Sequence, residues 1–252
     1  MITLNYQNEI EGQIGLFAPR NNYKINKPVR LIELFAGIGS QAQALKNLNI
    51  PFEHYRACEI DKYAIASYNA IHGTNFEATD ICKLKAEDLG ITDTDKYCYI
   101  LTYSFPCQDL SNAGKQAGMS KGSGTRSGLL WEVERLLCEA KELPQILLME
   151  NVPAVIGAKN MPDFEKWLKS LEELGYENHY QLLNAKDYGV PQNRNRCFMI
   201  SIFGGGHYEF PLPIPLNKRL KDVLEDEVDE KFYLSETAVE KLQRAELTPT
   251  NP

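Results

Sequence analysis

One cysteine of this sequence stands where a reactive thiol is expected. Cys107 lies in the segment Pro106-Cys107-Gln108, directly after the apolar run at 97–103, which predicts a buried strand. A residue just past the carboxyl end of a parallel strand faces the crevice in which α/β proteins bind ligands. Thiolates are strong nucleophiles, so we expect Cys107 to carry nucleophilic chemistry. Buried, inert thiols are expected at Cys58, Cys82, Cys98 and Cys138.

An acid and two arginines form a second set with chemical potential. Glu150 ends the apolar run at 145–149, where partial removal from water suits a carboxyl group to holding or giving a proton. Arg194 and Arg196 precede a predicted strand at 197–203, and their spacing of two points both to one side of an extended chain. The plainer alternatives are a helix-capping or salt-bridged acid and a solvated basic patch.

A glycine-containing turn indicates a ligand site of another kind. Phe35-Ala36-Gly37-Ile38-Gly39 joins an apolar strand at 29–35 to a helix predicted at 41–48 and capped by Ser40. A strand, a Gly-x-Gly turn and a helix N-terminus together are typical of nucleotide-like ligand sites. Ala42 stands where the dinucleotide fingerprint has its third glycine, so that fingerprint is absent. A tight turn without a ligand is the plainer alternative.

Two acids further along the chain extend this predicted site. Glu59 ends the second predicted strand, at 55–60, and is placed to accept hydrogen bonds from ribose hydroxyls. Asp80 ends the next unit and is placed to accept from an adenine amino group. A cofactor that contains a nucleoside is therefore expected here.

The elements that must position these residues alternate along the chain. Several predicted strands are apolar throughout, which is typical of a mainly parallel sheet covered on both faces. We therefore predict an α/β, Rossmann-like, doubly wound fold. Further strands are expected at 176–183 and 197–203, and helices at 62–72, 129–142, 164–174 and 236–245.

Length and charge set limits on the whole molecule. The 252 residues suit one large domain with an appendage: an N-terminal arm at 1–28, a catalytic domain at 29–206, and an acidic segment with a last helix at 207–252. The net charge is −7, and Asp222, Glu225, Asp226, Glu227, Asp229 and Glu230 hold most of the acidic excess. Neither a membrane-spanning run nor a signal peptide is visible, so we expect an intracellular protein. A zinc site or disulfide scaffold is not expected from the cysteine spacing.

Taken together, the four motifs resemble those of the cytosine-C5 DNA methyltransferases, which use S-adenosylmethionine. The resemblance runs from about residue 29 to 203 and includes Arg126-Ser127-Gly128-Leu129. It implies the Rossmann-like methyltransferase fold, a role in DNA methylation, and no metal. It also implies cofactor contacts from Phe35, Ala36, Gly37, Ile38, Gly39, Glu59, Ile60, Asp80, Ile81, Pro106 and Leu129, and substrate contacts from Gln108, Ser111, Arg126, Asn151 and Val152.

The resemblance also implies a mechanism. Cys107 would attack C6 of a cytosine flipped out of DNA, and Glu150 would hold N3 and the exocyclic amine. Arg196 would face O2 and the thiolate, and Arg194 would steady it or a phosphate. The stretch from 108 to 126 would clamp over the gap, and Phe35 would stack on adenine. The expected setting is the cytoplasm of a bacterial or phage-infected cell.

The sequence departs from the family after the arginine motif. Only 56 residues follow Arg196, and the family's Gly-Asn-Ser segment is missing, so we expect the target-recognition domain to be absent. A truncated chain, a remnant, and one half of a split enzyme, whose recognition domain is a second polypeptide, stay open. A tRNA cytosine-C5 methyltransferase and a non-catalytic cofactor-binding subunit are the alternative functions. Weak DNA binding is expected, through Lys115, Lys121, Arg126 and Arg194.

Overall fold

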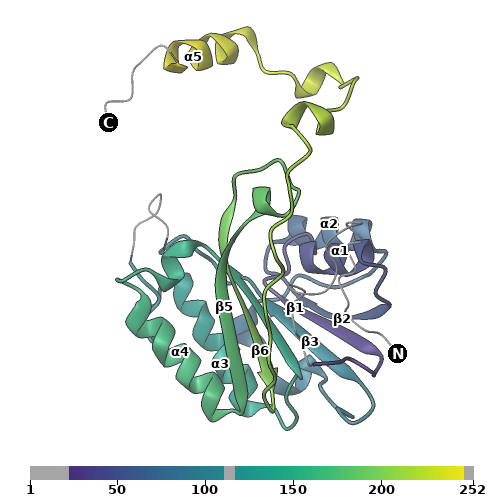
Figure 1. Ribbon diagram of the computed structural model, residues 1–252, viewed down its shortest axis with the longest axis vertical. Coiled ribbons are helices and arrows are strands. Elements are labelled where there is room, and N and C mark those ends of the chain that lie inside the picture. Colours follow the sequence, from purple (N-terminus) through teal and green to yellow (C-terminus); the bar gives the residue numbers. More distant parts are fainter. Residues whose placement is uncertain (1–22, 111–116, 247–252) are drawn as a thin grey trace.

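A six-stranded sheet forms the centre of the protein (Figure 1). The computed structural model describes residues 23–110 and 117–246. The strand order is β2-β1-β3-β4-β6-β5, and β6 alone runs antiparallel to the other strands. The predicted doubly wound, mainly parallel α/β sheet is thus confirmed. The strands are β1 (Val29–Leu34), β2 (Phe52–Cys58), β3 (Cys98–Tyr103), β4 (Ile146–Asn151), β5 (Tyr176–Asn184) and β6 (Asn195–Phe203).

Alternation along β1 shows how helices cover both faces of the sheet. Ile32 and Leu34 belong to the large buried cluster that contains the apolar residues of α3 and α4. Glu33 points to the opposite face, where it bonds to groups of α1 and α2. The helices are α1 (Ser40–Asn47), α2 (Lys62–His72), α3 (Leu130–Glu139), α4 (Met161–Glu173) and α5 (Glu236–Glu246).

Helix α2 has a capping residue at each end. It spans the predicted range, because the Asp61 carboxylate accepts hydrogen bonds from the amides of Tyr63 and Ala64 and Gly73 closes the helix in a left-handed conformation. The helix buries Ile65, Tyr68 and His72 against the sheet.

Three sequence expectations are corrected by the structure. Helix α1 is capped by Gly39, without a side-chain hydrogen bond, and not by Ser40, because a left-handed turn brings the chain into the helix. Strand β2 spans Phe52–Cys58, so Glu59 follows the strand and is not its last residue. Cys82 and Cys138 are exposed, since Cys82 lies in a short surface helix and Cys138 on the outer side of α3.

The chain beyond β6 changes character. Residues near 211–214 still pack on the domain, where Tyr188 donates to the carbonyl of Pro211 and pairs with Ile214. From residue 217 onward nearly every described side chain is exposed, and Figure 1 shows α5 away from the sheet. Within the described residues, no helix is long and apolar enough to cross a membrane.

Candidate active site

Cys107 lies just beyond the carboxyl end of β3 and is partly exposed. The loop that carries it follows Phe105, which is buried at 2% exposure and anchors the chain in the core. Three other thiols are buried: burial raises the pKa of Cys58 and Cys197 to about 12 and that of Cys98 to about 11. These three therefore remain protonated at neutral pH and are poor nucleophiles.

The Cys107 loop is held by a second loop that sequence reasoning did not single out as its support. The Ser127 hydroxyl donates to the carbonyl of Pro106 at 2.7 Å. The Asp109 carboxylate accepts from the amides of Arg126 at 2.8 Å and Ser127 at 3.3 Å. The bonds join the chain on both sides of Cys107 to the start of α3. Asp109 carries no separate signal in the sequence, because its partners lie 17 and 18 residues away.

Two predicted substrate contacts meet within this loop pair. The Arg126 guanidinium donates to the Gln108 side-chain oxygen at 2.9 Å, and both side chains are exposed. Ser111, also predicted to contact substrate, and Lys115 lie outside the described residues.

Glu150 lies at the end of β4 and meets both predicted arginines. Nη2 of Arg194 is 3.3 Å and Nε of Arg196 is 3.0 Å from the same oxygen, Oε1 of Glu150. The antiparallel pairing of β4 with β6 brings these residues together, since Glu150 pairs with Phe198. The Glu150 side chain is 19% exposed, so the cluster is accessible to a ligand.

Asn151 joins the Glu150 strand to the Cys107 loop. Its side-chain amide donates to the carbonyl of Phe105 at 3.0 Å, and its oxygen accepts from the amide of Val152. Asn151 is 2% exposed. In the structure the Asn151 side chain holds the ends of β3 and β4 together, and its predicted substrate contact stays a prediction. Val152 is partly exposed beside it.

The glycine turn after β1 has an unusual backbone. Phe35, Gly37 and Gly39 all have positive φ values, of 57°, 55° and 81°. Phe35 is strained by this conformation, because a side chain disfavours the left-handed region. Glu59 supports the turn: its carboxylate accepts from the amides of Gly37 and Asp61, each at 2.9 Å.

The remaining predicted cofactor residues lie along the same end of the sheet. Ile38 and Ile60 are exposed at 56% and 69%, which leaves apolar surface beside the turn. Asp80 accepts from the Cys82 amide at 3.0 Å and precedes the buried Ile81. Ala36 is buried, whereas Pro106 and Leu129 are partly exposed. Strands β1, β2 and β3 run parallel, so their carboxyl ends present these residues together.

The arrangement fits a cofactor with a nucleoside. Glu59 and Asp80 are acceptors, and a carboxylate has about four lone-pair sites, so each can accept further bonds beside those it makes to the backbone. Among the described residues, no cluster of acids, histidines and cysteines could hold a metal ion.

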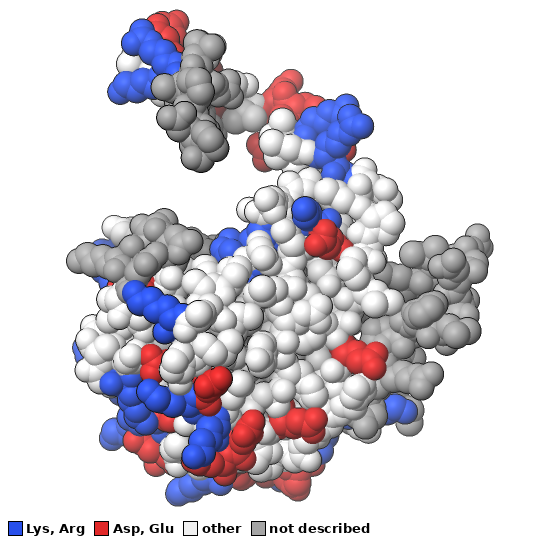
Figure 2. Space-filling model, turned by 60° about the vertical axis from the view of Figure 1, so that its left-hand side comes forward, with Lys and Arg blue, Asp and Glu red and all other residues white. Residues whose placement is uncertain are grey.

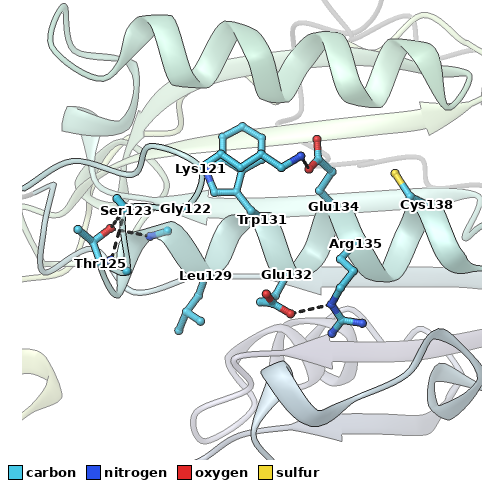
Figure 3. A pocket seen from close by; sticks show the side chains of 12 residues that line it. Lys121, Gly122, Ser123, Thr125, Leu129, Trp131, Glu132, Glu134, Arg135 and Cys138 are labelled. Atoms are coloured by element: carbon cyan, nitrogen blue, oxygen red, sulfur yellow. Dashed lines mark hydrogen bonds and ion pairs between the residues drawn. The ribbon is translucent and has the colours of Figure 1, made fainter.

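A shallow hollow of about 750 Å³ lies on the outer side of α3 (Figure 3). There the Lys121 ammonium pairs with the Glu134 carboxylate, close to the Trp131 ring, and Arg135 pairs with Glu132. Lys121, expected to contact DNA phosphates, is thus engaged with the domain. The ion pair of Lys121 with Glu134 and the bond from Trp131 to the carbonyl of Met119 fasten the chain after residue 117 to α3.

A family model and individual relatives both point to the same protein family. The model of C-5 cytosine-specific DNA methylases matches residues 29–252. The chain is 36% identical over 263 residues to the type II methyltransferase M2.ScrFI of Lactococcus lactis subsp. cremoris, covering 84% of this chain and 71% of that protein. It is also 36% identical to the orphan methyltransferase M.SssI of Spiroplasma monobiae, covering 89% and 72%.

A solved structure agrees. The Dnmt2 methyltransferase of S. pombe superposes with a TM-score of 0.66 at 26% identity, covering 85% of this chain and 65% of that one. This chain thus spans a little under two thirds of the length of that structure. With the family model matching nearly the whole of the described domain, the chain belongs to the family of C-5 cytosine-specific DNA methylases.

Proposed function

We propose that this chain transfers a methyl group from S-adenosylmethionine to C5 of cytosine in DNA, through a covalent bond between Cys107 and C6 of the base. One observation carries the proposal most strongly. Asn151 bonds to the carbonyl of Phe105, which ties the loop of Cys107 to the strand that ends in Glu150 and its two arginines. This connection supports a shared site for the proposed nucleophile, the acid and the two arginines at the carboxyl ends of β3 and β4.

The cofactor would lie along the ends of β1, β2 and β3. Phe35 would pack on the adenine, Glu59 would accept from the ribose hydroxyls, and Asp80 would accept from the adenine amino group. Ile60, Ile81, Pro106 and Leu129 would line the site, with the turn Ala36–Gly39 beneath it. S-adenosylmethionine, when bound, supplies a methyl group on a sulfonium, which is a strong electrophile.

Cys107 would solve the problem that C5 of cytosine is a poor nucleophile. Its thiolate adds to C6, and the electrons of the C5–C6 double bond shift so that C5 becomes nucleophilic, as in an enamine. C5 would then take the methyl group as its bond to the sulfonium sulfur breaks, which would leave S-adenosylhomocysteine. Loss of the C5 proton to a water molecule would re-form the C5–C6 double bond and expel the thiolate. The residue therefore needs access to the face of the ring, and this is available only if the base is flipped out of the duplex.

Glu150 and the arginines would hold the ring during this addition. A protonated Glu150 can donate to N3, and its other oxygen can accept from the exocyclic amine, which stabilises charge developing on the ring. Arg196 would face O2, and Arg194 would steady Glu150 or a phosphate. The ion pairs at 3.0 and 3.3 Å orient the carboxyl group before the base arrives and favour its ionised form, so Glu150 would take up the proton for N3 when the base binds.

DNA contacts would come from the Cys107 loop, through Gln108, Ser111, Arg126 and Val152. The hydrogen bond from the Arg126 guanidinium to the Gln108 side-chain oxygen joins two of these side chains, which supports the proposal that they contact DNA together. We also propose that the chain has three parts: an arm at 1–28, a catalytic domain at 29–206 and an acidic segment at 207–252. A second polypeptide would supply target recognition. The two sequence relatives named above, of Lactococcus lactis and Spiroplasma monobiae, are bacterial, and we place the reaction in the cytoplasm of a bacterial or phage-infected cell.

The test is covalent trapping. Duplexes that contain 5-fluorocytosine should form an adduct with the wild-type chain in the presence of S-adenosylmethionine, because fluorine cannot leave C5 as a proton does. Cys107→Ser should form none and should lose methyl transfer, while its affinity for S-adenosylhomocysteine stays within a few-fold. Cys82→Ser, which alters an exposed thiol, is the matched control. Peptide mapping that finds the adduct on another cysteine would contradict the assignment.

A further inference from the structure

A buried polar network lies beneath the turn of residues 35–39. Glu33 is fully buried in β1, and Tyr68 and His72 of α2 are 1% and 8% exposed. The Tyr68 hydroxyl donates to Oε2 of Glu33 at 2.6 Å, and the amide of Ala42 in α1 donates to Oε1 at 3.2 Å. One buried carboxylate thus joins β1, α1 and α2 around the turn.

The partners of His72 determine which of its ring nitrogens donates a hydrogen bond and which accepts one. Nε2 is 3.0 Å from the carbonyl oxygen of Ile38, and Nδ1 is 3.0 Å from Nζ of Lys46. A carbonyl can only accept, and an ammonium can only donate. These partners assign the donor role to Nε2 and the acceptor role to Nδ1, so His72 donates to the turn at Ile38 and accepts from Lys46 of α1.

The fit between the turn and these rings is close. A Cβ atom at Gly39 would lie 2.3 Å from Nε2 of His72 and 2.6 Å from Cε2 of Tyr68. The turn also contains Phe35 at a φ of 57°, a strained conformation that persists only where surrounding contacts impose it. Tyr68 and His72 contact this turn at Gly39 and at the carbonyl of Ile38, while the Ile38 side chain is exposed.

We propose that His72, with Tyr68 behind it, is a positioning residue for the cofactor: its bond to the Ile38 carbonyl holds the 35–39 turn in the shape that binds the nucleoside and the methionine part. The inference rests on the proposed function of that turn. His72 does not itself touch the ligand. Its loss therefore acts through the backbone of the turn and should weaken cofactor binding without altering the chemistry at Cys107.

The experiment is calorimetric titration of the whole chain with S-adenosylhomocysteine, which binds without turnover. His72→Leu and His72→Asn remove the donor to Ile38, because asparagine is too short to place an amide at the position of Nε2. His72→Gln restores it. We expect leucine and asparagine to weaken binding roughly 3- to 10-fold, the equivalent of one net hydrogen bond, and glutamine to stay within about 2-fold of wild type.

The control is His179→Leu on β5. Nε2 of His179 also lies 3.0 Å from a backbone carbonyl, that of Gly206, but at the edge of the sheet farthest from β1 and β2. This variant should bind S-adenosylhomocysteine as the wild type does. Steady-state kinetics should agree: His72→Asn should raise KM for S-adenosylmethionine and leave kcat and the KM for DNA within about 2-fold.

Each binding result either supports or contradicts the positioning role of His72. Unchanged affinity in His72→Asn would overturn the proposal, and so would a glutamine variant as weak as the asparagine one. Equal weakening in His179→Leu would show general loosening of the fold instead. If His72→Leu does not fold, the asparagine and glutamine pair still decides. A wild-type chain that binds no S-adenosylhomocysteine would refute the proposed function itself, which is a distinguishable result.

Discussion

The Glu59 side chain has a structural role in addition to the ligand role that we propose for it. The sequence predicts Glu59 as a ribose ligand, and in the structure both of its oxygens also hold backbone amides, those of Gly37 and Asp61. The carboxylate therefore links the turn after β1 to the start of α2. A ligand bond to such a residue is made to a group already fixed in place, which reduces the entropy lost on binding.

Glu59→Ala should weaken S-adenosylhomocysteine binding by about 1.5–3 kcal/mol, the range for hydrogen bonds to a charged group. Calorimetric titration measures this directly. Glu53→Ala is the control, because Glu53 lies near the opposite end of β2 and pairs with Arg30. If both variants bind equally well, Glu59 has no part in the cofactor site.

At the scale of elements, the Cys107 loop depends on the segment that opens α3. The Asp109 carboxylate accepts two amides there, and Ser127 returns a bond to the carbonyl of Pro106. Negative charge near a helix N-terminus is favourable, so the loop is held by a carboxylate at the entry to α3. Ser120 and Trp131 extend this fastening, through bonds to Asp163 and to the carbonyl of Met119.

Asp109→Ala should lower kcat for methyl transfer roughly 10- to 100-fold, because a small displacement of a nucleophile is costly to the rate. Its affinity for S-adenosylhomocysteine should change little. Asp109→Asn keeps one acceptor oxygen and should recover part of the rate, while Asp93→Ala, at an exposed acid paired with Lys96, should behave as wild type. A wild-type kcat in Asp109→Ala would exclude this positioning role.

At the scale of the whole molecule, charge limits the affinity for DNA. The net charge is −7, and basic and acidic side chains are intermixed on the face shown in Figure 2. Two of the cations expected to meet phosphates are paired within the protein, Lys121 with Glu134 and Arg194 with Glu150. Few counterions can therefore be released when this chain binds a duplex.

DNA binding by this chain should depend only shallowly on salt. With about two to four phosphate contacts at ~0.9 per phosphate, the log–log slope should be about −2 to −4. Fluorescence anisotropy with one labelled duplex, from low to physiological salt, measures this slope. Arg126→Ala should remove about one phosphate contact and so make the slope shallower by ~0.9. Lys218→Ala, in the exposed C-terminal segment, should leave the slope unchanged. A slope near −8, roughly nine contacts at the same increment, would reveal a basic surface that the charge distribution does not predict.

The order of the elements and the positions of the candidate reactive groups in them follow from local patterns in the sequence. Apolar runs and turn residues are local signals, so they predict α2 at its observed bounds and place Cys107 and Glu150 at strand ends. Local signals are weaker where the backbone is strained, and so they predict Ser40 as the cap where Gly39 stands. Nor do they show that Cys82 and Cys138 are exposed.

Which distant residues meet depends on the three-dimensional fold alone. Arg194 and Glu150 are 44 residues apart, and the reversed direction of β6 is what brings them into contact. The same holds for Asn151 and Phe105, 46 residues apart, and for Tyr68 and Glu33, 35 apart. The period of a strand or helix says which face a side chain is on, but the partner on that face follows from strand order and register, which are set by packing across the whole sheet.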